Sequence, residues 1–396
     1  MKINVVAVIP ARPQYFPALT GLRAVSALMV FFFHVVNVNA HVGALPRYLR
    51  WGVLLMQQLN IGVTIFFVLS GFLIANRYFN NVAVNKTWAK HYLQNRFARI
   101  YPLYFLLTAL TFGHMVLRPT YAWDEWPATY HYMDKVVAVV LNLSLTRAYS
   151  QDMVYLGVGT AWTLTIEESF YLCAPFLLLG LKRSVRRLSI YPIMLLIIGA
   201  LLVWICTHFV PRYGLMTSID FMLIYTFFGR GLEFVVGMGL AIWLARHQQK
   251  PLPPAGGTTW LGIIGISLCT AALALTVHFL HGENSEATRI WWLIHNVLLP
   301  FPIIALFYGL INEQTQFQRL LQTPVFDLLG RSSYAFYLIH VGVINSYFSA
   351  YVSDNWMVRL VGLTLVAIAL YKWVEHPLQK LLRSRPRAVS KPVPMH

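Results

Sequence analysis

The sequence predicts an all-α, polytopic membrane protein with about ten transmembrane helices and both termini in the cytoplasm. Of its 396 residues, 58% are hydrophobic and 11% are charged, and this charged share is less than half of that usual in a soluble domain. A single soluble core of this size could not bury so much apolar surface. A soluble enzyme, a disordered chain and a disulfide-stapled secreted domain are therefore poor fits.

Long apolar runs recur along the chain, and each can cross a hydrocarbon layer of ~30 Å at ~1.5 Å per residue. The predicted spans are 19–40, 52–75, 98–117, 160–181, 190–210, 220–245, 258–280, 290–311, 333–351 and 357–376. A further run, 136–145, is too short to span comfortably. Counting it as a span would also place the basic cluster 182–187 outside, against the positive-inside rule.

The charge distribution orients these spans. The net charge is +17, and the basic residues fall in short clusters between apolar runs, a pattern of membrane orientation and not of nucleic-acid binding. Cytoplasmic connections are predicted at 76–97, 182–189, 246–257 and 312–332. Residues 118–159 are predicted to form a large outside loop. We expect one membrane-embedded domain, 1–380, followed by a short basic cytoplasmic tail, 381–396.

Arg23 and His34 are ionisable residues inside the first predicted span, where a charge costs about 2.5–3.5 kcal/mol or more. They stand eleven positions apart, a rotation of about 1100°, so they share one helix face about 16 Å apart. This spacing places Arg23 at the cytoplasmic edge and His34 near mid-membrane, where an imidazole can exchange a proton near pH 7. The other interpretation of His34 is a histidine hydrogen-bonded in a helix interface.

Arg96 and Arg99 stand three apart at the cytoplasmic start of the third span. Both can face one way, and guanidinium groups bind phosphate oxygens in bidentate fashion. A phosphate site and a plain positive-inside anchor remain as alternatives. The three cysteines, Cys173, Cys206 and Cys269, lie inside apolar runs without metal-ligand spacing, so we expect core residues and no metal.

Glu167 and Glu168 lie in the stretch that opens the fourth span from outside, which begins at Trp162. Glu167 is one to two turns below the outer surface, and it approaches the depth that His34 reaches from the opposite side. A carboxylate that orients an imidazole is the usual arrangement of a general base. The alternatives are a structural glutamate in contact with water, and Glu168 as the inward carboxylate.

Four further ionisable groups fall inside predicted spans. Arg230 and Glu233 share one face of the sixth span, and an internal ion pair is the favoured interpretation over a polar wall for a sugar. His340 is expected to form a helix–helix hydrogen bond and not to act as a second base. Glu375 is expected to fix the inner end of the last span or to pair with a cytoplasmic arginine.

Six motifs follow one another in a distinctive order over residues 19–380. They are an arginine and a histidine separated by ten residues at 23–34, GVTIFFVLSGFL at 62–73, RFARIYP at 96–102, WTLTIEESFYL at 162–172, GRSSYAFYLIH at 330–340 and EHP at 375–377. With this order the chain resembles the acyltransferase 3 family of bacterial integral membrane O-acyltransferases. It departs from the family at Thr64, where the family often has Asp.

The resemblance implies that an acyl group, commonly acetyl, moves from cytoplasmic acyl-CoA to a hydroxyl of a surface glycan or other glycoside, such as the O-antigen of lipopolysaccharide. It implies a multi-pass protein of the bacterial cytoplasmic (inner) membrane. Arg23, Arg96 and Arg99 would hold the CoA phosphates, and the acyl arm would thread inward to His34. His34, oriented by Glu167, would act as general base, with an acyl-His34 intermediate as the competing mechanism.

Further contacts to substrate are expected from six residues of these motifs and of the sixth span: Ser70, Trp162, Glu168, Tyr171, Arg230 and Glu233. In the outside loop, Trp123, Trp126 and Tyr130 could stack on sugar faces. We expect no permanently bound cofactor, no metal and no nucleic-acid partner. A second class of function is a transporter or flippase, which the absence of an inverted repeat weakens. A third is an acyl-CoA sensor, which would need the arginines but neither His34 nor Glu167.

Overall fold

The computed structural model describes residues 15–39, 46–83, 85–117, 126–127, 129–247, 256–280 and 285–384. Its α-helices are α1 Pro17–Asn39, α2 Arg47–Met56, α3 Ile61–Tyr78, α4 Lys86–Leu117, α5 Tyr132–Leu143, α6 Trp162–Arg183, α7 Arg187–Phe209, α8 Ile219–Tyr225, α9 Phe227–Arg246, α10 Gly257–Leu280, α11 Ser285–Trp292, α12 Pro300–Asn312, α13 Gln316–Leu321, α14 Pro324–Ile339, α15 Val343–Tyr351, α16 Trp356–Leu370 and α17 His376–Leu382. Two π-helical turns, Leu293–Leu298 and Tyr371–Glu375, join α11 to α12 and α16 to α17.

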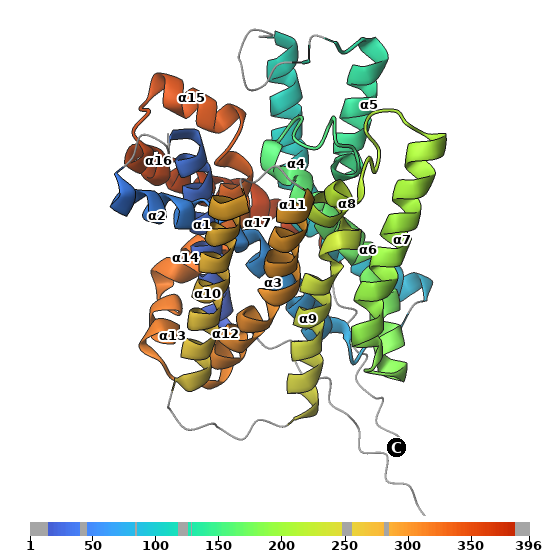
Figure 1. Cartoon of the computed structure of the whole chain (residues 1–396), viewed down its shortest axis with the longest axis vertical. Coiled ribbons are helices and arrows are strands. Elements are labelled where there is room, and N and C mark those ends of the chain that lie inside the picture. Colours follow the sequence, from blue (N-terminus) through green and yellow to red (C-terminus); the bar gives the residue numbers. More distant parts are fainter. Residues whose placement is uncertain are drawn as a thin grey trace, which may run out of the picture.

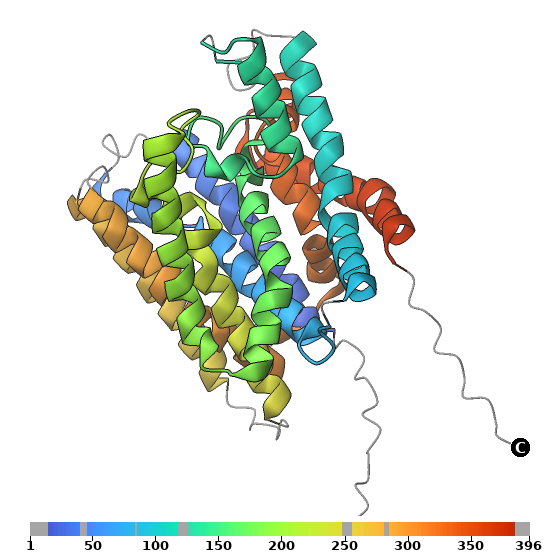
Figure 2. The same cartoon turned by 90° about the vertical axis from the view of Figure 1, so that its right-hand side faces the viewer.

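This architecture confirms the predicted all-α class. In the described ranges the only extended pairing is one antiparallel bridge between Ser150 and Leu215. Most helices run side by side along the molecule (Figure 1). We call the end where α6 and α9 finish and α7 begins the basic end, because Arg183, Arg246 and Arg187 stand there. The opposite end, which carries α5, α15 and the segment 144–161, is called the loop end (Figure 2).

Nine helical segments in the described part of the chain are long and apolar enough to cross a membrane. They are Pro17–Asn37, Leu49–Tyr78, Lys86–Leu117, Gly159–Arg183, Arg187–Phe209, Ile219–Arg246, Gly257–Phe279, Glu286–Asn312 and Trp356–Leu382. Each matches one predicted span, so the chain is a multi-pass membrane protein. Helix α5 has only 12 residues and is not among the nine, in agreement with the prediction that the run 136–145 is too short to be a span.

The ninth predicted span, 333–351, is wrong as a continuous helix. Helix α14 ends at Ile339, and α15 restarts at Val343 after Gly342, whose φ is +91°. A left-handed backbone favours glycine and does not continue an α-helix. Helix α14 alone has 16 residues, which is about 24 Å of helix and shorter than the ~30 Å hydrocarbon layer. The cytoplasmic placement of both termini stays a prediction.

Tertiary contacts also move other predicted boundaries. The third span begins at Lys86 and not at residue 98, because α17 packs beside the polar first turns of α4 and Gln94 donates to the Leu382 carbonyl (2.9 Å). The sixth span is split at Thr226, which is extended (φ −116°, ψ 160°) and separates α8 from α9. The basic tail is described only to residue 384, and the remainder of 381–396 lies outside the described residues.

Helices α3 and α9 pack against each other at the centre of the bundle, and glycines set how closely they approach. A Cβ atom on Gly237 would lie 2.0 Å from the Val68 carbonyl oxygen, and one on Gly71 would lie 2.1 Å from that of Phe234. Small residues permit this backbone contact between helices in a membrane. The contact fixes the position of Arg230, near the start of α9, relative to α3.

We expect Gly237→Ala to destabilise the protein by roughly 1–3 kcal/mol, because the added methyl group forces the two backbones apart. The matched control is Gly239→Ala on the same helix, where a Cβ would lie 3.5 Å from the nearest Leu188 side-chain atom. Thermal unfolding in detergent measures both. Equal melting temperatures for the two variants would contradict the close α3–α9 packing.

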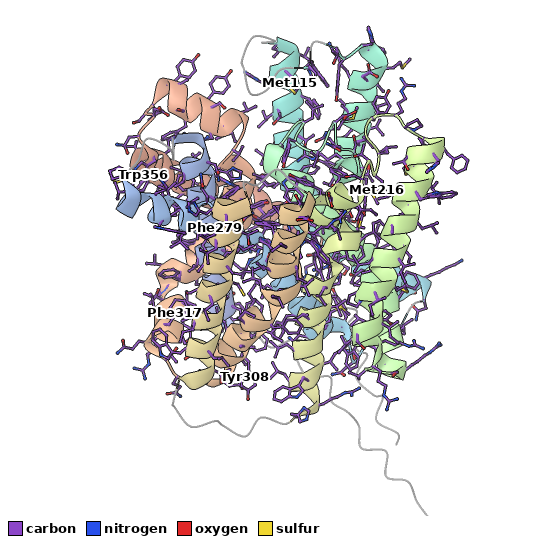
Figure 3. All side chains as sticks on the ribbon, in the orientation of Figure 1. Met115, Met216, Phe279, Tyr308, Phe317 and Trp356 are labelled. Atoms are coloured by element: carbon purple, nitrogen blue, oxygen red, sulfur yellow. The ribbon has the colours of Figure 1, made fainter. Side chains whose placement is uncertain are left out.

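The outer surface of the bundle is apolar. Leu268 and Phe279 on α10 and Ile197 on α7 are each more than 60% exposed. Figure 3 shows Trp356 at the left edge of the bundle, with Tyr308 near the basic end and Met115 near the loop end. An exposed apolar belt of this kind suits contact with lipid chains.

Candidate active site

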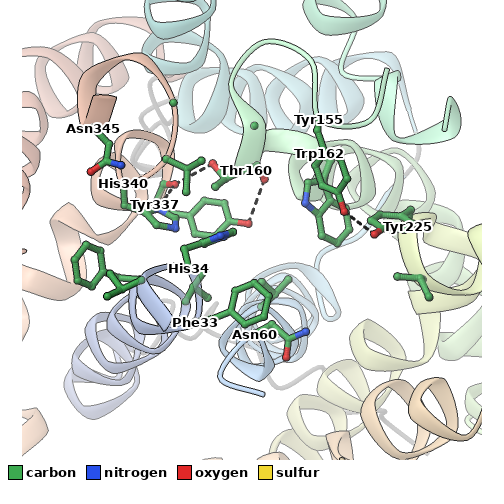
Figure 4. A pocket seen from close by; sticks show the side chains of 18 of the residues that line it. Phe33, His34, Asn60, Tyr155, Thr160, Trp162, Tyr225, Tyr337, His340 and Asn345 are labelled. Atoms are coloured by element: carbon green, nitrogen blue, oxygen red, sulfur yellow. Dashed lines mark hydrogen bonds between the residues drawn. The ribbon is translucent and has the colours of Figure 1, made fainter. Parts of the chain in front are cut away.

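A cavity of about 1030 Å³ lies in the loop-end half of the bundle. Its walls come from α1, the start of α3, residues 155–162, α8, α9, α10, α11 and the α14–α15 break. Figure 4 shows His34, Tyr337 and His340 gathered on one side of this space and Tyr155, Trp162 and Tyr225 on another. A cavity of this size can hold a small-molecule ligand and be lined by both aromatic and polar groups.

His34 is half-buried on α1 and lines this cavity. Its ring centre lies 5.2 Å from that of His340 and 4.9 Å from that of Phe33. The imidazole therefore faces an internal space and another histidine. This is the kind of position from which a side chain can exchange a proton with a bound hydroxyl.

His340 is fully buried at the end of α14 and also lines the cavity. Its Nδ1 lies 2.8 Å from the carbonyl oxygen of Tyr337 in the same helix. The expected helix–helix hydrogen bond is thus wrong, because His340 bonds to a carbonyl of its own helix. A carbonyl only accepts, so Nδ1 carries the proton of a neutral ring and Nε2 is an acceptor. That Nε2 has no partner among the described residues.

Glu167 lies away from His34. One of its carboxylate oxygens accepts hydrogen bonds from Ser70 (2.6 Å) and from the Tyr171 hydroxyl. In the described part of the chain no hydrogen bond joins Glu167 to His34. The two side chains do not meet because they lie at different depths in the bundle. Helix α6 starts with Trp162 at the cavity, and Glu167 follows about 7.5 Å further toward the basic end.

The three predicted donor-site arginines gather between the cavity and the basic end. Arg99 forms an ion pair with Glu375 (2.6 Å), which confirms the predicted pairing of Glu375 with an arginine; its cytoplasmic side stays a prediction. Arg99, Glu167 and Glu375 all act electrostatically on Arg23. We call Arg23, Arg96, Arg99, Glu167 and Glu375 the arginine cluster.

Arg96 packs against aromatic rings. Its guanidinium carbon lies 5.4 Å from the centre of the Tyr171 ring and 5.8 Å from that of Tyr78. Glu168 points to the same region: Arg96 and Tyr101 are among its electrostatic partners, and its Oε2 is buried without a hydrogen-bond partner. The expected contact residues Ser70, Glu168 and Tyr171 therefore lie by the arginine cluster and do not line the cavity.

Comparison of the sequence with known proteins identifies a family. A family model described as an acyltransferase domain matches residues 16–372. The chain belongs to the acyltransferase 3 family. It is 26% identical to the acyltransferase MdmB of Streptomyces mycarofaciens, over 96% of each chain. It is 24% identical to the O-acetyltransferase OatA of Staphylococcus aureus (strain NCTC 8325), over 93% of this chain.

A putative O-acetyltransferase of Staphylococcus aureus (strain COL) is likewise 24% identical over 93% of the chain. The chain spans 58% of the length of these Staphylococcus aureus relatives. No solved structure matches it. The six motifs that carry the family resemblance are thus distributed between two places in this acyltransferase domain, the cavity and the arginine cluster.

Arg230 and Glu233 form the internal ion pair that the sequence predicted. Arg230 Nε lies 3.0 Å from Glu233 Oε2, and Nη2 lies 2.8 Å from Oε1. Arg230 lines the cavity, whereas Glu233 is fully buried behind it. Arg230 also donates to Thr64 Oγ1 (3.1 Å). Thr64, which stands where the family often has Asp, therefore belongs to a network whose carboxylate is supplied by Glu233.

His295 is a cavity residue that the sequence analysis missed. It lines the cavity, and its Nδ1 contacts Thr64 Oγ1 (3.3 Å) and Asn296 Oδ1 (2.7 Å). The sequence did contain a signal for His295. This residue lies inside the predicted span 290–311, where an ionisable side chain is costly and therefore marks a candidate functional residue.

Two of the aromatic residues expected to bind sugars in the outside loop, Trp126 and Tyr130, do not line the cavity. Trp126 stacks on Phe112, Tyr130 donates to the Asp152 carbonyl, and Trp123 lies outside the described residues. Trp162, Trp291 and Tyr337 line it instead.

Proposed function

We propose that this protein is an integral membrane O-acyltransferase of the bacterial inner membrane. It moves an acyl group, commonly acetyl, from cytoplasmic acyl-CoA to a hydroxyl of a surface glycan or related glycoside. One observation carries the proposal: in a chain of the acyltransferase 3 family, His34 lines a large cavity and Arg23 stands on the same helix about 16 Å away. The names of MdmB and OatA support acyl transfer to oxygen.

The arginine cluster is the proposed donor site. Among the described residues, Arg23 and Arg96 form no salt bridge to a carboxylate, and the Nε of each is buried without a hydrogen-bond partner. Guanidinium groups that form no salt bridge are suited to bind the phosphates of coenzyme A. Glu167 acts here on the donor side, where it holds Ser70 and Tyr171 beside Arg96.

None of the three arginines lines the cavity. The acyl-bearing arm of coenzyme A must therefore displace side chains between the arginine cluster and His34. On α3, Phe66 stands between Val63 at the cavity and Ser70 at the cluster. Its ring contacts that of Tyr337 (6.0 Å between centres). In this proposal the acyl arm displaces these two rings to reach His34. Binding energy from the CoA phosphates would be spent on this displacement.

His34 is the proposed general base. It takes the proton of the acceptor hydroxyl as that oxygen attacks the thioester carbonyl. The new C–O ester bond forms, the C–S bond breaks, and coenzyme A leaves as a thiolate that takes the proton from the imidazolium. In the competing mechanism His34 itself attacks the thioester and holds the acyl group before transfer.

Transfer of labelled acetyl from acetyl-CoA by the purified protein tests the proposal directly. Mass spectrometry of surface glycans from cells with and without the protein identifies the acceptor by its added acetyl mass. We expect the acetyl mass to be lost with the protein. Retention of every glycan acetyl group, together with no labelled product, would refute the proposed activity.

Arg96→Ala is expected to raise the KM for acetyl-CoA about tenfold to a hundredfold with a smaller change in kcat, because charged hydrogen bonds to phosphate are worth ~1.5–3 kcal/mol. Lys90→Ala on the same helix is the matched control, since Lys90 is exposed. Steady-state kinetics at varied acetyl-CoA measure both. An unchanged KM in Arg96→Ala would remove Arg96 from the donor site.

A further inference from the structure

His295 stands in an unusual place in the fold. It lies in the π-helical turn Leu293–Leu298, between α11 and α12. Such turns are rare and occur frequently at functional sites, because the extra residue re-aims the side chains around it. His295 is 1% exposed, and its ring stacks on that of Trp291 at 4.2 Å between centres. Both residues line the cavity.

The hydrogen bonds of Asn296 determine the tautomer of His295. Asn296 Nδ2 donates to the Leu223 carbonyl (3.2 Å), so its Oδ1 is the atom 2.7 Å from His295 Nδ1. An amide oxygen only accepts, so Nδ1 carries the proton of the neutral ring. Nε2 therefore presents a lone pair. It is buried and has no partner among the described residues.

A buried acceptor without a donor is costly and calls for an explanation, such as a ligand that supplies the donor. Two residues of the cavity wall have such a nitrogen, Nε2 of His295 and Nε2 of His340. They belong to different walls, since His340 lies beside His34 whereas His295 lies beside Trp291. A ligand with several hydroxyl groups could donate to both.

The electrostatics of the wall that carries His295 and Trp291 disfavour an anionic ligand. The lone pair of His295 Nε2 would repel an anion, and the positive charge of Arg230 is already balanced by Glu233 at 2.8 Å. A purely apolar ligand would leave both imidazole acceptors unpaired. A neutral, hydroxyl-rich ring satisfies the acceptors and can lie against the flat faces of Trp291 and Trp162.

We infer that His295 is an acceptor-binding residue whose Nε2 accepts a hydrogen bond from a hydroxyl of a neutral glycoside, on the wall of the cavity that carries Trp291. This inference rests on the proposed function, which supplies the reason for a glycoside in the cavity. It follows that the two histidines contact different hydroxyl groups of the same ligand. His34 contacts the reacting hydroxyl, and His295 binds another one.

Two substitutions separate the roles of the two ring nitrogens. His295→Asn keeps a donor near Nδ1 for Asn296 but has no atom at the position of Nε2. His295→Gln reaches that position with its amide group. The probes are the methyl β-glycosides of glucose, galactose and N-acetylglucosamine, and their dissociation constants come from thermal shifts of the purified full-length protein in detergent.

We expect at least one glycoside to bind the wild type, His295→Asn to weaken that binding about tenfold, and His295→Gln to stay within about threefold of the wild type. Monodeoxy versions of the bound glycoside give a second measurement on the wild type alone. Removing one particular hydroxyl should weaken binding about tenfold. No binding of any of the three glycosides, or equal affinities in His295→Asn and wild type, would overturn the inference.

Coenzyme A is the internal control. It should produce the same thermal shift in the wild type and in both variants, since its proposed site is the arginine cluster. If coenzyme A shifts none of the three proteins, the proposed donor site fails, whatever the glycosides do. If coenzyme A shifts all three and the glycosides bind without regard to residue 295, only the role of His295 fails.

Discussion

Purified His34→Ala is expected to lose acyl transfer by about 10²–10⁴-fold in kcat, the range that a positioned general base contributes. The side chain lines the cavity and is only half-buried, so its loss leaves the helix packing of α1 in place. Since the defect lies in the chemical step, kcat and kcat/KM should fall together. Steady-state transfer of labelled acetyl measures this loss.

The control for His34→Ala is His208→Ala, which removes an exposed histidine at the end of α7. It should transfer acetyl at the wild-type rate, and both variants should keep the thermal shift with coenzyme A. Intact-protein mass spectrometry after mixing with acetyl-CoA separates the two mechanisms, because only the covalent route leaves an acetyl group on His34. Near-normal turnover by His34→Ala would refute both.

Arg230→Met is expected to lower the free energy of unfolding by about 3–5 kcal/mol. Glu233 is fully buried and both its oxygens face Arg230. Removal of the arginine leaves this carboxylate with an uncompensated charge in a medium that solvates it poorly. Chemical unfolding in detergent, followed by tryptophan fluorescence, measures the loss.

The double variant Arg230→Met/Glu233→Met should recover most of that stability, since an ion pair replaced by apolar residues of similar volume often costs little. Arg289→Met is the surface control: Arg289 is largely exposed and lies 3.4 Å from Asp220, so its loss should cost less than about 1 kcal/mol. If the double variant is as unstable as the single one, the uncompensated charge is not the cause.

Because polar and charged groups are costly to place in lipid, much of the fold could be predicted from the sequence. Apolar length predicted nine of the helical segments, and it also excluded 136–145, where α5 has only 12 residues. Because an unpaired charge is costly inside a span, the spacing of three residues between Arg230 and Glu233 was enough to predict their ion pair. Helical periodicity placed Arg23 and His34 on one helix face.

The sequence did not predict features that depend on where a helix is interrupted or on which distant helix it meets. Gly342 breaks the predicted ninth span and leaves His340 bonded to its own helix. His295 meets Thr64 across 231 positions, and Arg99 meets Glu375 across 276. These partners are selected by three-dimensional packing and hydrogen-bond geometry, which no local pattern encodes.

By itself the sequence determined a helical membrane protein with a histidine and an arginine on one face of its first helix, because apolar length, charge and periodicity are properties of short segments. Only the tertiary structure decided that Glu167 turns to Ser70 and the arginine cluster, and that His34 and His295 line one cavity. The physical reason is that a side chain's depth and partners depend on how whole helices shift and break against one another.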